Sequence, residues 1–243
     1  MESLKDKAVL VTGASRGIGR AIALTFAERG AKLALIARDE EALRSVQQEI
    51  YGVGGEAFHL FCDICDEWSV KRTVEDVHAQ LEAIDILINN AGVGIHGPVE
   101  SYSLANWRTT IETNLTSVFL MCRAVIPIMR TQGMGRIINV SSGAGRNGIA
   151  NLAAYCASKH GLIGFTESLA LEVRNDGILV STAIPGSTDT EFSGRAPEHA
   201  GVRVSTEGRL SPFEVAEAIA SLCETNPNAW ISELVIRPLK LKQ

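Results

Sequence analysis

A tyrosine and a lysine four residues apart, Tyr155 and Lys159, have the residue types and the spacing to do chemistry. If the stretch around them is helical, four residues correspond to about 400° of rotation and roughly 6 Å of rise, so both side chains project from one face. A tyrosine with its ordinary pKa of about 10 exchanges protons poorly at neutral pH, and a neighbouring ammonium lowers that pKa. The pair could therefore supply an acid–base tyrosine, although the same spacing also occurs on ordinary helix surfaces.

A glycine-rich turn near the amino end predicts a dinucleotide site. The apolar run 7–11 is typical of a buried strand, and the pattern of 20–29 is typical of a helix that ends at Gly30. Backbone N–H groups at a helix start bind phosphate, and glycines let a pyrophosphate approach closely. A purely structural turn would need only one glycine. The residues of this turn that we expect to bind the cofactor are Gly13, Ser15, Arg16, Gly17, Ile18 and Gly19.

The end of the second predicted strand, 32–37, favours NADP over NAD. An NAD site usually has a carboxylate here that binds the ribose 2′-hydroxyl. This chain has Ala37 followed by Arg38. Arg38 and Arg16 could together bind a 2′-phosphate, because guanidinium groups match phosphate geometry. Asp39 and Glu40 come next, and we interpret them as acids in the first turn of the following helix.

Strand and helix patterns alternate through the rest of the sequence and predict one α/β domain over 1–243. Further strands are expected at 57–62, 84–88, 135–140, 179–184 and 231–236, and helices at 40–51, 66–81, within 103–130, from Tyr155 to about 174, and at 211–224. The polar stretch 187–210 has no clear period. A connection of that length suggests a lid or a short helical excursion, and we expect it to admit the substrate.

Small and polar residues follow the predicted strands, where open α/β sheets bind ligands. Asp63 either accepts a hydrogen bond from an adenine amino group or caps the turn into the next helix. Asn114 lies within an apolar helical stripe, where its amide must be hydrogen-bonded. The other candidates at strand ends are Ile64, Asn90, Ala91, Gly92, Ser142, Pro185 and Gly186.

Composition and charge argue against several other classes. A net charge of −5 without a dense Lys/Arg run argues against nucleic-acid binding. We expect no signal peptide and no membrane span, because the first residues are polar and no apolar run approaches about 20 residues. Five cysteines favour reduced thiols and a cytoplasmic location. Cys62 and Cys65 form a C-x-x-C pair, which has either a redox role or none, and we expect no metal site.

An ordered set of motifs resembles the short-chain dehydrogenase/reductases over essentially the whole chain. Ser142 lies 13 residues before Tyr155, a spacing typical of that family. The motifs are Thr12-Gly13-x-x-x-Gly17-x-Gly19, Asn89-Asn90-Ala91-Gly92, Asn114, Ser142, Tyr155-x-x-x-Lys159 and Pro185-Gly186. The resemblance implies one doubly wound, Rossmann-type domain of about seven mostly parallel strands with helices on both faces, a nicotinamide cofactor and no metal.

The resemblance also implies roles for the catalytic residues. Tyr155 would exchange a proton with the oxygen of a ketone or secondary alcohol. Lys159 would lower the pKa of Tyr155 and hold the nicotinamide ribose. Ser142 would donate to the carbonyl oxygen, and Asn114 would hold a water that links Lys159 to solvent.

For the cofactor, the resemblance implies two groups of contacts. Asn90, Ala91 and Gly92 would line the adenosine and ribose, and the carboxamide and phosphates would be held by Pro185, Gly186, Thr188 and Thr190. Family members usually assemble through the helices that carry Asn114 and Tyr155, so a homotetramer or homodimer is expected.

Substrate identity is less constrained. The sequence looks most like 3-oxoacyl-acyl-carrier-protein reductases and related NADP-dependent carbonyl and hydroxy-acid reductases, so a carrier- or CoA-bound 3-oxoacyl group or a 3-hydroxy acid is expected. Its ending, 233–238, departs from the Gly-Gly turn usual in the fatty-acid enzymes. We expect substrate contacts from 94–96, 146–149 and 187–210, with His96 either a contact or incidental. The alternative function is a catalytically silent sensor of NADP(H).

Overall fold

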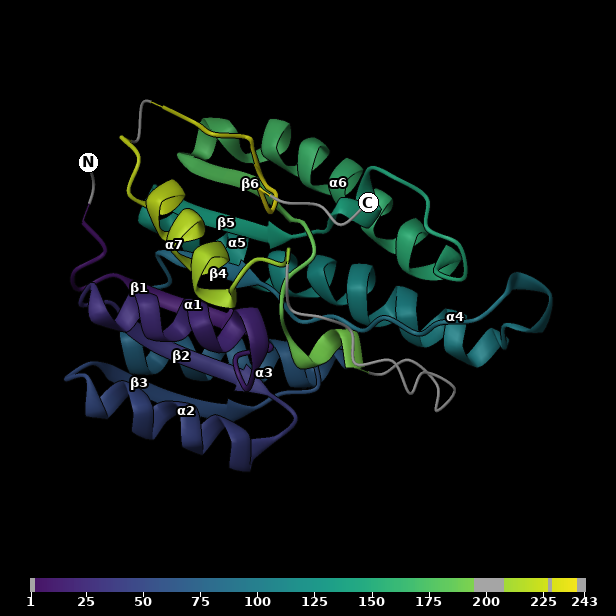
Figure 1. Cartoon of the computed structure of the whole chain (residues 1–243). Helices are drawn as coiled ribbons and strands as arrows, with labels where there is room; N and C mark the ends of the chain where they lie inside the picture. Colours follow the sequence, from purple (N-terminus) through teal and green to yellow (C-terminus); the bar gives the residue numbers. More distant parts are fainter. Residues whose placement is uncertain (1–2, 195–207, 227–228, 240–243) are drawn as a thin grey trace.

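Seven strands form one sheet in the order β3-β2-β1-β4-β5-β6-β7, and every neighbouring pair is parallel (Figure 1). The structure is a computed structural model that describes residues 3–194, 208–226 and 229–239. The strands are β1 (Ala8–Thr12), β2 (Lys32–Ala37), β3 (Glu56–Phe61), β4 (Ile86–Asn89), β5 (Gly135–Val140), β6 (Ile178–Pro185) and β7 (Glu233–Ile236). The strand order reverses between β1 and β4, which creates a crevice at their carboxyl ends. The predicted doubly wound α/β fold is confirmed.

Helices cover both faces of this sheet (Figure 1). They are α1 (Gly17–Glu28), α2 (Glu40–Gly52), α3 (Glu67–Leu81), α4 (Leu104–Ile111), α5 (Ser117–Gln132), α6 (Ala153–Val173) and α7 (Pro212–Cys223). Side chains of α1, α2 and α7 share one apolar cluster, and those of α3, α5 and α6 share another on the opposite face.

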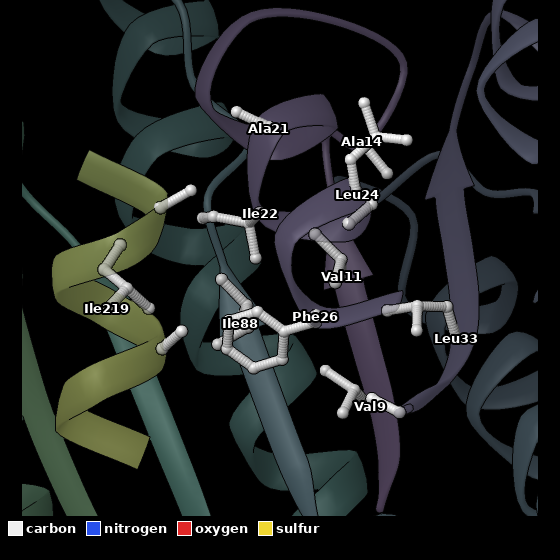
Figure 2. Packing of buried hydrophobic residues seen from close by; sticks show 14 of the residues in the cluster. Val9, Val11, Ala14, Ala21, Ile22, Leu24, Phe26, Leu33, Ile88 and Ile219 are labelled. Atoms are coloured by element: carbon white, nitrogen blue, oxygen red, sulfur yellow. The ribbon is translucent and has the colours of Figure 1, made fainter. Parts of the chain in front are cut away.

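The first four residues of β1, Ala8–Val11, are all apolar because the strand is buried on both faces. Val9 and Val11 pack beneath α1, whereas Leu10 between them packs into the cluster on the other face. Figure 2 shows Phe26 of α1 and Ile219 of α7, which belong to the same apolar cluster as Val9 and Val11. A strand buried on both faces needs apolar residues at every position. Each large side chain buried in this way contributes about 1.5–3 kcal/mol to folding.

The helix predicted within 103–130 is interrupted. It consists of α4, one π-helical turn at Glu112–Thr116, and α5. The π turn contains the buried Asn114, whose amide bonds outside the helix, and such turns occur often at functional sites. Among the described residues, the combined run Leu104–Gln132 is the one stretch long and apolar enough to cross a membrane, a test that core helices also pass.

Strand β4 begins at Ile86, two residues later than predicted, because the N–H of Ile84 donates to the side chain of Gln132 rather than to a strand. The predicted substrate stretch 187–210 is anchored where it begins and ends. The N–H of Asp189 donates to Leu210 O at 2.8 Å, and the N–H of Leu210 donates to Ser187 O at 2.8 Å. A short 3₁₀ turn occupies Glu191–Gly194, and 195–207 lie outside the described residues.

Candidate active site

A cavity of about 770 Å³ opens at the carboxyl edge of the sheet, where the strand order reverses. Most residues predicted from the sequence line it. They are Gly13, Ser15, Arg16, Gly17, Ile18, Arg38, Asp63, Ile64, Asn90, Ala91, Gly92, Ser142, Tyr155, Lys159, Pro185, Gly186, Thr188 and Thr190. Gly19 and Asn114 lie behind the wall. The cavity is therefore large enough and suitably placed for a dinucleotide.

The glycine turn leaves the start of α1 free for an anion. Gly13 and Gly17 have φ of +64° and +56°, a conformation that favours glycine, and a Cβ at Gly13 would lie 2.8 Å from Ala91 Cα. Arg16 occupies the N-cap position of α1, and its side chain makes no capping hydrogen bond. The first N–H groups of this helix can therefore bind a phosphate.

Gly19 also supports the turn from behind. A Cβ there would lie 2.2 Å from Gly13 O and 2.5 Å from Asn90 Nδ2, so glycine lets α1 pack against the turn. Asn90 Nδ2 itself donates to Gly13 O and Thr12 O, and Thr12 Oγ1 accepts from the N–H groups of Asn90 and Ala91. Gly19 lies in the first turn of α1, and its contact with the cofactor stays a prediction.

Arg16 and Arg38 lie on the wall at the end of the cavity that β2 approaches. Arg16 Nη1 is 3.8 Å from a carboxylate oxygen of Glu191. Asp39 accepts from the N–H of Ala42 and is the N-cap of α2, one position before the first turn expected from the sequence, whereas Glu40 lies in that turn as interpreted. Two cationic side chains at one end of the cavity can bind a phosphate group.

One of the two predicted roles of Asp63 is observed. Asp63 lines the wall, and its Oδ1 accepts from the N–H of Cys65 at 3.0 Å. The cap of α3 is Asp66, which accepts from the N–H of Ser69. Asp63 therefore caps the turn that leads into α3, as one reading predicted, and a contact with adenine stays a prediction.

Tyr155 and Lys159 lie on one buried face of α6 and both reach the cavity. Their side chains are 9% and 4% exposed. Lys159 Nζ donates to Val140 O at 2.9 Å and lies 5.9 Å from the centroid of the Tyr155 ring. The helix thus places a phenol and an ammonium together in a site with little water.

Burial determines the proton affinity of both groups. Burial raises the pKa of Tyr155 above 10, and its hydrogen bond with Ser142 offsets part of this effect. Burial lowers the pKa of Lys159 to about 8. The lost hydration of the phenolate dominates, so the pKa of Tyr155 lies above its ordinary value, and a lowering contribution from Lys159 stays a prediction.

Ser142 and Asn114 support this pair from two sides. Ser142 begins the 3₁₀ turn Gly143–Gly145, and its Oγ accepts from the N–H of Ala144. Asn114 is fully buried. Its Oδ1 accepts from Val93 N–H at 2.8 Å, and its Nδ2 donates to Val93 O and to Ser158 Oγ. Asn114 thus ties the segment after β4 to α6 beside Lys159, and the water predicted for it stays a prediction.

The substrate side of the cavity combines apolar and polar side chains. Gly94, His96, Asn147, Ile149 and Leu152 line it. Arg146 was expected here, but it is not part of the wall and pairs with Glu233 of β7. Residues of the 94–96 and 146–149 segments therefore meet at the cavity, but Arg146 is not part of its wall.

Glu191 and Phe192 also line the wall, within the predicted substrate stretch 187–210, in which sequence reasoning singled out neither residue. The rings of Phe192 and Tyr155 have centroids 5.7 Å apart at 48°. No motif marks these residues, because their short turn lies in a stretch without periodicity.

The Cys62–Cys65 pair also lines the cavity, but neither thiol has the features of a redox group. Cys65 Sγ lies 3.7 Å from Thr113 Oγ1, and burial raises the pKa of both thiols. All five cysteines are free. Among the residues that the structure describes, no three His, Cys, Asp or Glu side chains are grouped to hold a metal.

A glycine turn at an uncapped helix and a buried Tyr–Lys pair thus share one cavity. The family model described as short chain dehydrogenase matches residues 7–201. The chain belongs to this family. It is therefore an oxidoreductase, and the resemblance inferred from its motifs is confirmed.

Relatives of this short-chain dehydrogenase include carbonyl reductases. It is 41% identical over 231 residues to the granaticin polyketide synthase putative ketoacyl reductase 1 of Streptomyces violaceoruber, covering 93% of this chain and 85% of that protein. It is 40% identical to the 3-oxoacyl-acyl-carrier-protein reductase FabG of Salmonella typhimurium, covering 90% and 91%. A metagenomic short-chain oxidoreductase solved in complex with NADP is 39% identical, with a TM-score of 0.86 and coverage of 99% and 100%.

Proposed function

We propose that this protein is an NADPH-dependent ketone reductase in which Tyr155 donates the proton. One observation carries the proposal: the Tyr155–Lys159 pair, buried on one face of α6, lies in the cavity that also contains the uncapped start of α1. The first feature is suited to proton transfer to an oxygen, and the second to a phosphate.

The cofactor is NADP. Arg16 and Arg38 lie on the wall where an NAD enzyme has a carboxylate, and the similar metagenomic oxidoreductase was solved with NADP. When bound, the nicotinamide supplies the hydride. The residues of this chain hold the cofactor and manage the proton.

The pKa directions favour reduction at neutral pH. Because burial raises the pKa of Tyr155, its phenol is protonated and ready to donate to the oxygen of a ketone as that oxygen gains negative charge. Lys159, with a pKa of about 8, is mostly cationic at pH 7 and offsets the charge left on Tyr155. Ser142 donates to the same substrate oxygen.

We propose 3-oxoacyl thioesters, carried by a carrier protein or CoA, as the substrate class. The support is the similarity to two ketoacyl reductases and the apolar side chains of Ile149, Leu152 and Phe192 on the substrate side. NADPH oxidation should be compared for acetoacetyl thioesters, short 3-oxo acids and unfunctionalised ketones. The thioesters should give the highest kcat/KM, and a preference for simple ketones would contradict this substrate class.

Replacing Arg38 with alanine should weaken NADPH far more than NADH. A charge-assisted contact with phosphate contributes about 1.5–3 kcal/mol, so the KM for NADPH should rise about 10- to 100-fold. The KM for NADH should change less than two-fold. Steady-state kinetics with both cofactors measures this, and equal effects would mean that Arg38 does not contact the 2′-phosphate.

We further propose that the protein is a homotetramer or homodimer formed through α4, α5 and α6. Large apolar side chains are exposed on these helices, at Leu104, Trp107, Phe119 and Leu171. Light scattering at micromolar concentration should give two or four times the mass of 26.1 kDa, and a monomer would contradict the proposal. The five free cysteines also fit a cytoplasmic location.

A further inference from the structure

Two consecutive residues of the 3₁₀ turn Glu191–Gly194 contact two different predicted site residues, Arg16 and Tyr155. Glu191 lies 3.8 Å from Arg16 at the end where we place the cofactor phosphate. Phe192 packs on Tyr155 at the end where we place the carbonyl. One turn of backbone thus joins the phosphate end of the site to the proton donor.

The Phe192 ring is fitted closely into the substrate side. A Cβ at Gly94 would lie 3.0 Å from Phe192 Cζ and 3.9 Å from Tyr155 Cδ2, so Gly94, Phe192 and Tyr155 are mutual neighbours. Tyr155 is only 9% exposed in this arrangement. A substrate carbonyl bound at Tyr155 would therefore lie close to the Phe192 ring.

The residues just before this turn contact the glycine turn that precedes α1 and are held by backbone hydrogen bonds. The Thr190 side chain would lie 3.5 Å from a Cβ at Gly17. Ser187 and Asp189 are held by backbone hydrogen bonds to Leu210. The Glu191 side chain is 76% exposed, and Phe192 as a residue is 42% exposed. Both can therefore shift without moving the hydrogen-bonded residues Ser187 and Asp189.

The Arg16–Glu191 pair is well suited to being displaced. Its 3.8 Å separation is too long for a hydrogen bond, and both side chains are more than half exposed. Exposed pairs of this kind are weak. A phosphate carries more charge than a carboxylate and binds a guanidinium through two hydrogen bonds, so it should win the competition for Arg16.

We propose that Glu191 competes with the 2′-phosphate of NADP for Arg16, and that loss of the Arg16–Glu191 contact moves Phe192 away from Tyr155. NADP binding thereby opens the carbonyl site. NAD, which lacks the phosphate, leaves the pair in place. The inference rests on the proposed function for one point, the contact between Arg16 and the phosphate.

Binding of two nucleotides that lack nicotinamide tests the competition. Isothermal titration calorimetry should show that Glu191→Gln binds 2′,5′-ADP about two- to five-fold more tightly than the unmodified protein, while AMP affinity is unchanged. Glu67→Gln is the matched control, because Glu67 pairs with Arg123 on α5, outside the cavity. It should leave both affinities unchanged.

Arg16→Ala distinguishes failure of the proposed contact between Arg16 and the phosphate from failure of the competition by Glu191. If this variant binds 2′,5′-ADP as well as the unmodified protein, Arg16 does not hold the phosphate, and the inference fails together with that part of the proposed function. If Arg16→Ala weakens binding while Glu191→Gln has no effect, the cofactor assignment stands and only the competition is overturned.

The proposed movement of Phe192 on loss of the Arg16–Glu191 contact can be measured separately by NMR. The protein has seven phenylalanines, so ¹⁹F NMR of protein labelled with 4-fluorophenylalanine gives a small set of signals, and Phe192→Leu identifies that of Phe192. We expect 2′,5′-ADP, but not AMP, to shift this signal. In Glu191→Gln the signal should already lie near the shifted position before ligand is added. Equal shifts with both nucleotides, or no shift with 2′,5′-ADP, would overturn the coupling.

Discussion

Tyr155→Phe should abolish ketone-dependent oxidation of NADPH and leave NADPH binding nearly unchanged. The substitution removes one oxygen from a buried ring and keeps the contact between the rings at positions 155 and 192. General acid catalysis by a placed side chain contributes about 10²- to 10⁴-fold, so kcat should fall at least 100-fold. The uncapped helix and the two arginines, which bind the phosphates in our proposal, are untouched.

Initial rates with acetoacetyl thioesters and a fluorescence titration with NADPH measure the two effects separately. Tyr51→Phe is the matched control, because the Tyr51 hydroxyl is exposed and bonds to Ala57 O outside the cavity. It should keep full activity. Turnover by Tyr155→Phe within ten-fold of the unmodified enzyme would contradict the mechanism. No turnover by the unmodified protein over a broad panel of ketones and alcohols would instead favour the NADP(H) sensor.

The parts of the fold and site that could be predicted are those fixed by local pattern. The run Ala8–Val11 is apolar at every position because both of its faces are buried, and that pattern is visible in the sequence. Tyr155 and Lys159 share a helix face because of their spacing alone. The glycine turn follows a strand and begins a helix, so its cavity could be placed before any coordinates were known.

The parts that could not be predicted depend on contacts between distant segments. Asn114 was expected in a regular helix, and its bonds to Val93 accompany a π turn that no local pattern marks. Phe192 reaches Tyr155 from a stretch without periodicity. Spacing gives the distance from Tyr155 to Lys159 but not the amount of water that both groups lose, and that loss raises the pKa of Tyr155 and lowers that of Lys159.

That loss of water leads to the second large effect, a gain in stability when Lys159 is removed. Burial lowers the pKa of Lys159 from 10.5 to about 8, which corresponds to a cost of about 3 kcal/mol at neutral pH, since one pKa unit is about 1.4 kcal/mol. Lys159→Met keeps the apolar stem and removes the charge. It also loses the hydrogen bond to Val140 O, worth about 1 kcal/mol, so we expect a net gain of about 1–2 kcal/mol.

The same variant should lose activity, because no cation remains to offset the charge on Tyr155. Urea unfolding at pH 7 measures the free energy of unfolding, and NADPH oxidation measures the activity. Lys71→Met is the control: Lys71 is exposed and pairs only loosely with Glu75, so its free energy of unfolding should change by less than about 0.5 kcal/mol. A Lys159→Met protein less stable than the unmodified one would show that Lys159 is retained for structure.

The pH dependence of stability gives this prediction a second, independent test. Between pH 8 and 10 the unfolded lysine keeps its proton while the folded one releases it, so the stability contributed by this site rises with pH. Above pH 10 the unfolded tyrosine ionises while Tyr155, whose pKa is raised, does not, so stability then falls. Burial also raises the pKa of four cysteines, Cys62, Cys65, Cys122 and Cys223, which lowers the stability of both proteins over the same pH range. The contribution of Lys159 is therefore a difference: the unmodified protein should gain stability relative to Lys159→Met between pH 8 and 10, and both should fall above pH 10. No relative gain would mean that the buried charge of Lys159 is not the cost that this active site bears.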